Sequence, residues 1–383
     1  MRQTSETLGI GIIGCGNIST TYLTFAPLFQ GIEVRACADM SQEAAQTRAA
    51  EYGIRSSSVQ DLLASDDIDI ILNLTIPDAH FAVTKSILEA GKHAYSEKPL
   101  VLTLEQGQEL KALADANGLK VGCAPDTFLG GSHQLARKTV DDGTLGTITS
   151  GTAHIMGHGM EHWHPNPDFF FKKGGGPILD MGPYYVTNLI NLIGPVKRVA
   201  ALSSIPSPTR TITSQPRHGE TLTVETPTTI HALLEFASGA VVTLSASWDV
   251  WSHRHGYTEL YGTDGSLYLP DPNFFGGTLE ASGTDKTVAA VEGWSHPFNP
   301  DNYETPEGMV ANYRTAGLAD FALSIIEKRD ARCSLERALH VVDVLTSILR
   351  SGEEGRFIDL TTTCTRPAAL GIEEATALLR TGS

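Results

Sequence analysis

A glycine-containing turn near the N-terminus has the residue types and spacing of a phosphate-binding site. The segment Gly14-Cys15-Gly16-Asn17-Ile18-Ser19 fits the pattern Gly-x-Gly-x-x-small, with a serine where a third glycine often stands. It follows an apolar run directly and opens a stretch compatible with a helix, which is the setting of a dinucleotide-binding turn. Gly14 permits the tight turn, and Gly16 lets the backbone approach a pyrophosphate that the next helix's amides face. The context therefore predicts dinucleotide binding, although a bare Gly-x-Gly also occurs in ordinary turns.

An aspartate ends the next apolar run. Asp39 follows residues 33–38 and is placed to accept hydrogen bonds from the adenosine ribose hydroxyls, which favours NAD over NADP. Met40 and Ser41 follow it, so the next two residues offer no arginine for a 2′-phosphate. NADP stays possible because a neighbouring loop can supply such a charge. An ordinary surface aspartate is the simpler alternative.

A lysine ends another short strand pattern. Glu97-Lys98-Pro99 falls at the carboxyl edge of the predicted sheet, where open α/β sheets bind ligands. A lysine there can act as an acid or base or orient a hydroxyl, since burial and a nearby nicotinamide cation lower the pKa of an ammonium group. Glu97 is placed to fix that ammonium. As an isolated tripeptide the pattern is weak, because Glu-Lys pairs are common on surfaces.

Alternating strand and helix patterns must position these groups. The regular alternation predicts a parallel sheet covered on both faces by helices. We expect strands at 8–13, 33–38, 68–74, 93–95 and 120–123, and helices at 18–29, 42–52, 80–90 and 104–116. These elements form a first domain over residues 1–126.

The pattern changes beyond residue 126. Alternating apolar and polar residues predict a large, mostly antiparallel sheet that is open on one face, with strands at 147–156, 230–235, 241–247, 259–261 and 266–269. The segment 203–227 is rich in Ser, Thr and Pro and is expected to be a loop. Helices near 310–327 and 335–349 close an α/β second domain over 127–383, and we expect the 310–350 region to pack back near the first domain.

Composition excludes several classes of protein. The 383 residues are 41% hydrophobic and 19% charged, as in a globular protein, and no apolar run is long enough for a spanning helix. A formal net charge of −16 argues against nucleic-acid binding. Residues 1–7 are short and polar, without the layout of a signal peptide. The five scattered cysteines suit a reducing compartment, so we expect a cytoplasmic protein without a membrane partner.

Four ordered blocks carry a resemblance to a known family. They are GCGNIS at 14–19, TIPDAHF at 75–81, AGKHAYSEKPL at 90–100 and GGGPILDMGPYY at 174–185. The chain resembles the Gfo/Idh/MocA oxidoreductases over essentially its whole length. The resemblance implies an N-terminal Rossmann domain and a C-terminal α/β domain whose open sheet often packs against a second subunit, so a homodimer or homotetramer is expected.

The resemblance also implies roles for individual residues. Lys98 corresponds to the family's catalytic lysine, while Asp180 and the residue four places on belong to the substrate and proton-transfer site. The cofactor is NAD, with NADP possible. The residues implied to line the nicotinamide half of the cofactor cleft are Thr75, Pro77, His80 and Glu97, beyond the pyrophosphate turn with Gly14, Gly16, Asn17 and Ile18.

The chain departs from the commonest family pattern at one position. Many members have histidine four residues after the aspartate, whereas this chain has Tyr184, as some relatives do. If residues 179–192 form one helix, Asp180 and Tyr184 lie one turn apart on one face. One group must take the alcohol proton and another must hold the developing alkoxide. A tyrosine is a poor base at its ordinary pKa of about 10 unless a cation such as Lys98 lowers it.

A histidine- and aromatic-rich loop is expected to select the substrate. Residues 154–171 read HIMGHGMEHWHPNPDFFF, and aromatic faces stack on sugar rings while His and Asp bind hydroxyls. Trp163 and His164 are the preferred contacts, with Asp126 and Asp168 as weaker candidates. Histidines at 154, 158 and 162 invite a zinc site on a helix, but the glycines between them oppose a continuous helix, so no metal is expected. Trp248, Trp251, His253 and His255 could belong to the same cleft or to a subunit interface.

The residues favour one function over two others. The leading hypothesis is an enzyme, an NAD(P)-dependent dehydrogenase or reductase acting on a secondary alcohol of a sugar, anhydrosugar or cyclitol. A glycosidase that oxidises its substrate transiently with bound NAD would use the same fold. A non-catalytic regulator that senses the nicotinamide is the third reading, and it has no need to keep both Lys98 and Asp180.

Overall fold

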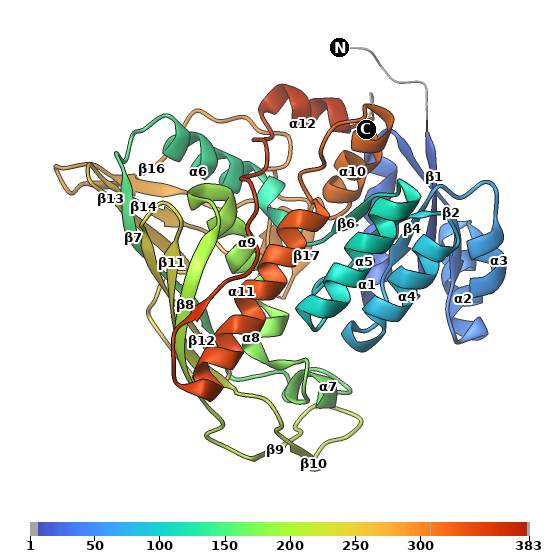
Figure 1. The fold of residues 1–383 in the computed structure, drawn as a ribbon, viewed down its shortest axis with the longest axis horizontal. Helices are drawn as coiled ribbons and strands as arrows, with labels where there is room; N and C mark the ends of the chain where they lie inside the picture. The colour runs from blue at the N-terminus through green and yellow to red at the C-terminus, as the bar shows by residue number, and fades with distance from the viewer. Residues whose placement is uncertain (1–6, 307, 381–383) are drawn as a thin grey trace. The chain divides into compact units, whose positions relative to one another are not determined.

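The computed structural model describes residues 7–306 and 308–380, and the chain forms two compact units (Figure 1). Among the described residues, the first unit comprises 7–131, 295–306, 308–339 and 367–380, and the second comprises 132–294 and 340–366. The polar segment up to residue 6 lies outside the described residues. The chain therefore passes between the units several times, whereas the sequence predicts a single division at 126/127. That division into domains stays a prediction.

The first unit contains a six-stranded sheet in the order β3-β2-β1-β4-β5-β6. Every neighbouring pair is parallel, which confirms the predicted sheet. The strands are β1 (Leu8–Ile13), β2 (Ile32–Ala38), β3 (Arg55–Ser56), β4 (Ile70–Asn73), β5 (His93–Ser96) and β6 (Val121–Cys123). The strand order reverses between β1 and β4, and this switch point is where open α/β sheets bind ligands.

Helices alternate with these strands (Figure 1). They are α1 (Asn17–Phe25), α2 (Gln42–Tyr52), α3 (Val59–Ala64), α4 (Pro77–Glu89) and α5 (Leu104–Asn117), with short 3₁₀ turns at Ala26–Leu28 and Thr127–Leu129. Two later helices, α10 (Ala316–Ile326) and α12 (Ile372–Leu378), belong to the same unit. Pro27 lies in the first of those turns, so α1 ends before the expected residue 29. The helix expected from residue 310 begins at Ala316, because β17 (Tyr303–Thr305) and β18 (Gly308–Val310) pair ahead of it.

The second unit contains a nine-stranded sheet in the order β16-β15-β14-β13-β7-β12-β11-β8-β19. All neighbours are antiparallel except β7 and β12, so the predicted mostly antiparallel sheet is confirmed. The strands are β7 (Ile148–Met156), β8 (Val196–Ser204), β11 (Thr229–Phe236), β12 (Val241–Ser247), β13 (Thr258–Gly262), β14 (Ser266–Leu269), β15 (Glu280–Ser282), β16 (Val288–Ala290) and β19 (Ile358–Asp359). The segment expected to be a loop forms a hairpin of β9 (Thr209–Thr211) and β10 (Thr221–Thr223).

Helices cover one face of this sheet. Along β11, Ile230, Ala232 and Leu234 are buried in the hydrophobic core, while His231 and Leu233 point to the other, exposed face. Side chains of the helices over Gly182–Ile193 and Leu335–Glu354 complete that core, and Figure 1 shows these two helices as α9 and α11. The helices are α6 (Gly131–Asp141), α7 (Asp168–Phe171), α8 (Gly176–Asp180), α9 (Gly182–Ile193) and α11 (Leu335–Glu354). Among the helices of the described residues, none is long and apolar enough to cross a bilayer.

Candidate cofactor and substrate sites

Gly14 occupies a position that only glycine can hold. Its φ is +105°, and a Cβ built there would lie 2.6 Å from the carbonyl carbon and oxygen of Leu74. The Gly14 amide donates to the carbonyl oxygen of Ala38 at 2.9 Å. The end of β1 is thus tied to the end of β2 and lies directly against the segment after β4, at the switch point of the sheet.

Gly16 leaves open space at the N-terminus of α1. It is the N-cap residue, and a Cβ built on it meets no described atom within 4 Å. The first turn of α1 carries no acidic side chain, and Ser19 Oγ donates to the Gly16 carbonyl at 2.6 Å instead of occupying the helix end. A helix N-terminus with approachable amides attracts anions. The turn fits a pyrophosphate.

The carboxylate of Asp39 contacts this turn directly. Its Oδ2 accepts from the Cys15 amide at 2.7 Å, and its Oδ1 accepts from the Ser41 amide at 2.8 Å. The side chain is partly exposed at the end of β2. A carboxylate has about four acceptor positions, so two backbone bonds leave capacity for ribose hydroxyls. Met40 beside it is fully exposed.

His80 joins the segments that follow β4 and β5. Its Nε2 lies 2.9 Å from the Thr75 carbonyl oxygen, and its Nδ1 lies 2.6 Å from the Pro99 carbonyl oxygen. Burial lowers the pKa of His80, while the two carbonyl contacts oppose that shift. Thr75 is also fixed by Asn73, whose Oδ1 accepts from the Thr75 hydroxyl at 2.7 Å. Pro77 begins α4.

Tyr22 holds the glutamate that precedes Lys98. The Tyr22 hydroxyl donates to Glu97 Oε1 at 2.8 Å, and the Lys98 amide donates to Glu97 Oε2 at 3.0 Å. Burial raises the pKa of Tyr22 well above its ordinary value, and the Glu97 carboxylate raises it further, so the phenol stays a donor. The sequence gives no signal for this role, because Tyr22 lies within a helix pattern and the contact spans 75 residues.

Residues 179–192 do not form one continuous helix, so the condition for placing Asp180 and Tyr184 one turn apart on one helix is not met. Asp180 is the last residue of α8, Met181 separates the helices, and Tyr184 stands in the first turn of α9. The reason is Pro183, which has no amide hydrogen for a bond to the preceding turn. The Tyr184 amide donates to the Met181 carbonyl at 3.1 Å. Tyr184 is partly buried against the core of the second unit, and Asp180 is partly exposed.

Asp126 has a structural role in the first unit. It is 1% exposed, and its Oδ2 accepts from the amides of Thr315 and Gly317 at 3.1 and 2.9 Å. These bonds satisfy amides at the start of α10, as a helix cap does. Burial raises the pKa of Asp126 to about 6. A substrate contact by Asp126 stays a prediction, but the described bonds of this side chain serve the fold.

The predicted substrate loop gathers aromatic rings in the second unit. Trp163 is 56% exposed, and its ring meets His164 edge-on with centroids 5.4 Å apart. Phe169 and Phe170 also pack edge-on against His164. Asp168 pairs with Arg217, which lowers the pKa of the carboxyl group. The loop therefore presents an exposed indole packed on an imidazole, and a carboxylate that an arginine neutralises.

The histidines of this loop do not share a helix. His154 lies in β7 and stacks on His255 with centroids 4.1 Å apart, whereas His158 stacks on Trp251 at 3.4 Å. This geometry contradicts the zinc-on-a-helix alternative. Over residues 7–306 and 308–380, no three His, Cys, Asp or Glu side chains gather as a metal site would require.

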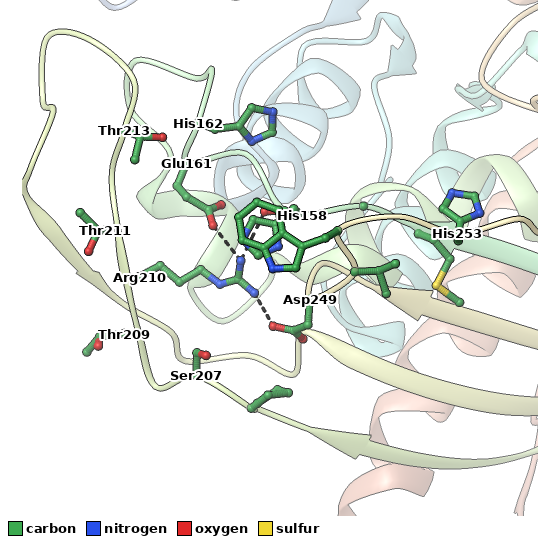
Figure 2. Close-up of a pocket in the computed structure, with 15 residues that line it drawn as sticks. His158, Glu161, His162, Ser207, Thr209, Arg210, Thr211, Thr213, Asp249 and His253 are labelled. Atoms are coloured by element: carbon green, nitrogen blue, oxygen red, sulfur yellow. Dashed lines mark hydrogen bonds and ion pairs between the residues drawn. The ribbon is translucent and has the colours of Figure 1, made fainter.

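A pocket opens beside this loop within the second unit (Figure 2). Its volume is about 960 Å³. Three segments distant in sequence line it: the loop after β7, the β9 hairpin and the residues after β12. Figure 2 shows Arg210 between Glu161 and Asp249, with dashed lines to both carboxylates. None of these three residues is among the predicted site residues.

Comparison with known proteins shows two family models on this chain. The model described as "Oxidoreductase family, NAD-binding Rossmann fold" matches residues 8–124, and "GFO/IDH/MocA C-terminal domain" matches residues 133–268. The first range holds the six-stranded sheet, and the second holds Asp180, Tyr184 and much of the nine-stranded sheet.

Curated relatives are distant in sequence. Levoglucosan dehydrogenase from Pseudarthrobacter phenanthrenivorans is 26% identical over 68% of this chain and 73% of that protein. D-xylose dehydrogenase from Paenarthrobacter nicotinovorans is 24% identical over 80% of each chain. 1,5-Anhydro-D-fructose reductase from Ensifer adhaerens is 29% identical over 45% of this chain and 52% of the relative. With several curated relatives the match spans only about half of their length.

Solved structures share the fold over nearly the whole chain. An NAD-binding oxidoreductase from Klebsiella pneumoniae superposes with a TM-score of 0.79 at 22% identity, covering 93% of this chain and 100% of that one. Levoglucosan dehydrogenase in complex with NADH has a TM-score of 0.78 at 20% identity, with the same coverage. These likenesses show the fold.

Proposed function

Because the chain belongs to the Gfo/Idh/MocA family of oxidoreductases, we propose that it transfers a hydride between a nicotinamide dinucleotide and a secondary alcohol of a sugar, anhydrosugar or cyclitol. The observation that carries the proposal is the turn at Gly14 and Gly16. Its backbone lies at the switch point of a parallel sheet, its helix end is open to an anion, and an acidic side chain contacts it. Curated relatives named for sugars support the substrate class.

The first unit would hold the dinucleotide through its backbone and one carboxylate. The turn of Gly14 and Gly16, with the amides of Asn17 and Ile18, would take the pyrophosphate. Asp39 would accept from the adenosine ribose hydroxyls, which favours NAD, with NADP possible. Beside the nicotinamide we place Thr75, Pro77, His80, Glu97 and Lys98. His80 contacts the carbonyl oxygen of Thr75, and Tyr22 holds Glu97, which accepts from the Lys98 amide.

The chemistry needs a proton carrier and a group that stabilises charge. When bound, the nicotinamide accepts or returns the hydride. We assign Lys98 and Tyr184 to taking the alcohol proton and holding the developing alkoxide, because an ammonium and a phenol can donate to an oxyanion and exchange protons. Asp180 would orient the substrate or polarise the phenol. Tyr22 holds Glu97 and thereby fixes the backbone of Lys98.

The substrate would meet the aromatic loop of the second unit. Trp163 is exposed and offers a face for the apolar side of a sugar ring, while the adjacent His164, and Asp168 of the same loop, supply polar atoms. The substrate-binding role of all three is part of this proposal.

The proposed partner is a second copy of the chain, in a homodimer or homotetramer. Leu202, Leu233 and Val241 lie on neighbouring strands of the uncovered sheet face and are 75, 46 and 42% exposed. Apolar side chains on an exposed sheet face are typical of an interface. We place the protein in the cytoplasm, since its five buried cysteines are scattered along the sequence without a CxxC pair, which suits a reducing compartment.

A cofactor and substrate screen tests the function. NAD and NADP are each offered with a panel of sugars, anhydrosugars and cyclitols, and formation of reduced nicotinamide is followed by absorbance. We expect stoichiometric NADH with at least one polyol. Product formation without net NADH would favour the transient-oxidation glycosidase. Dinucleotide binding without turnover of any panel member would favour a regulator.

A further inference from the structure

Three charged residues form the floor of the pocket in the second unit, and their side chains are largely buried. They are Arg210, Glu161 and Asp249. Arg210 has a side chain 6% exposed, and its Nη1 lies 2.7 Å from Oε1 of Glu161, whose side chain is 8% exposed. Its Nη2 also pairs with Asp249, and the guanidinium lies over the Phe171 ring at 5.2 Å. Burying three charges costs free energy that hydrophobic side chains of the same volume would not cost. This arrangement therefore calls for a role besides packing.

Polar atoms on that floor lack partners among the described residues. They are Oε2 of Glu161, Nε of Arg210 and Nδ1 of His158. A buried polar atom without a hydrogen bond costs about 1–3 kcal/mol. A carboxylate oxygen accepts and a guanidinium nitrogen donates, and a hydroxyl group can do both in return. The unpartnered set is complementary to hydroxyl groups.

The charge of the pocket selects against anions. Two carboxylates face one guanidinium, so the floor carries an excess negative charge. Burial lowers the pKa of His158, and the Arg210 cation lowers it further, which keeps this imidazole neutral near pH 7. An uncharged ligand rich in hydroxyls suits these surroundings better than a phosphate or a sugar acid.

The pocket also has an aromatic wall. Trp251 stacks on His158 through one face, with ring centroids 3.4 Å apart, and is 83% exposed. Hydroxyl-bearing residues of the β9 hairpin segment also line the pocket, and Figure 2 shows them along the segment that carries Arg210. They are Ser207, Thr209, Thr211 and Thr213. An exposed indole can stack on the apolar C–H face of a sugar ring, while hydroxyl and carboxylate groups in the same pocket can bind the hydroxyl groups of the sugar.

From these observations we propose that the second unit carries a binding pocket for a neutral saccharide, formed by Glu161, Arg210 and Trp251. Asp180 and Tyr184 lie outside the described residues that line it, so this site differs from the proposed proton-transfer residues. Its volume of about 960 Å³ is at the upper end of the ~300–1,000 Å³ usual for small-molecule sites. This favours a glycoside or disaccharide over a single small polyol.

Binding without dinucleotide tests the pocket separately from the proposed function. Cellobiose, maltose, methyl α-D-glucopyranoside and glucuronate are titrated into the full chain, and binding is followed by saturation-transfer NMR and calorimetry. We expect at least one neutral saccharide to bind and glucuronate to bind more weakly. Trp251→Ala, at an exposed position, and the isosteric Glu161→Gln should each raise the dissociation constant at least tenfold. Phe357→Ala removes another exposed ring, 60% exposed, and should change nothing.

Several outcomes would overturn the proposal. Failure of all three neutral saccharides to bind at millimolar concentration would do so, as would unchanged affinity in Trp251→Ala. If Trp251→Ala alters the sedimentation coefficient while saccharide binding persists, the indole is a subunit contact instead. Should Glu161→Gln fail to fold, Thr209→Val at the exposed rim takes its place, with a weaker loss expected. Absence of NADH formation in the cofactor screen would leave this binding result intact.

Discussion

The backbone amide of Cys15 donates to Oδ2 of Asp39, with 2.7 Å between nitrogen and oxygen. The residue proposed to read the ribose is therefore also the residue that shapes the glycine turn. A carboxylate held by a backbone amide is fixed before any ligand arrives, so less side-chain freedom is lost on binding. Cofactor affinity and turn geometry should be coupled through this one side chain.

Replacing Asp39 should weaken NAD more than NADP. Asp39→Asn keeps an oxygen for the Cys15 amide but removes the charge that favours ribose hydroxyls and repels a 2′-phosphate. We expect roughly tenfold weaker NAD binding, since a charged hydrogen bond is worth about 1.5–3 kcal/mol. Titration of each dinucleotide into the variant measures the change in its dissociation constant, and Glu33→Gln serves as the control at an exposed position. Unchanged NAD affinity would remove Asp39 from the site.

The two glycines of the turn should respond differently to alanine. Gly14→Ala puts a Cβ against the Leu74 carbonyl at a positive φ, so the free energy of unfolding should fall by about 1–3 kcal/mol or more. Gly16→Ala meets open space at an ordinary φ and should fold normally, yet crowd a bound pyrophosphate. Thermal melts and dinucleotide titrations separate the two effects. Normal cofactor binding by Gly16→Ala would contradict the assigned pyrophosphate site.

Lys98→Ala should slow turnover strongly without abolishing dinucleotide binding. General acid–base groups contribute about 10²–10⁴-fold to rate, so kcat should fall within that range. The control is Lys85→Ala, which removes an exposed lysine paired with Glu109. Steady-state kinetics and a dinucleotide titration decide the matter. Full activity in Lys98→Ala would end the assigned mechanism.

Tyr184 should be replaceable by histidine but not by phenylalanine. Tyr184→Phe loses the proton carrier, and kcat should drop at least a hundredfold, within the range of acid–base catalysis. Tyr184→His restores an exchangeable proton, and its pH–rate profile should move toward lower pH, because imidazole ionises near ~6.5 and a phenol near ~10. Profiles of all three proteins are compared over the same pH range. Unchanged kcat in Tyr184→Phe would indicate that Tyr184 only packs against the core.

Buried histidines should make the fold sensitive to acid. His340 Nε2 accepts from the Val196 amide at 3.0 Å, so it must be unprotonated, and burial lowers the pKa of His340 to about 4. As pH falls below about 6.5, the unfolded chain binds a proton before the folded chain does, and the free energy of unfolding decreases. The loss is on the order of 3 kcal/mol at pH 4 for this residue.

Urea unfolding between pH 7 and pH 4 measures this dependence. His340→Gln keeps an acceptor for the Val196 amide without a titrating ring, so its stability should change less steeply with pH. His133 and His296, whose pKa values burial also lowers to about 4, still titrate in that variant. Identical pH slopes in the two proteins would show that His340 binds protons equally in the folded and unfolded states, which would contradict its lowered pKa.

Secondary-structure elements are predictable from the sequence where the local residue pattern and the burial coincide. β1 is buried along its whole length, so its sequence is a continuous apolar run. This run predicts a strand that ends directly before Gly14. The break between α8 and α9 was readable from Pro183, but the apolar periodicity on either side obscured it. The β9 hairpin is short and rich in threonine, which resembles a loop in composition.

The rest of the site depends on contacts between distant segments. Glu161, Arg210 and Asp249 come from two loops and a hairpin, and each alone reads as a surface charge. Tyr22 reaches Glu97 only because α1 folds beside β5's end. Such pairings follow from chain topology, which local periodicity does not specify.

The strand order of the second unit affects how its ligand preference can change. β7 and β8 are separated in the sheet by β12 and β11, and the connection between them, residues 157–195, carries Trp163, Asp168, Asp180 and Tyr184. Both ends of this connection are anchored in a hydrogen-bonded ladder. Insertions or deletions within it can therefore remodel specificity without shifting strand register, so we expect divergence among related enzymes to concentrate there.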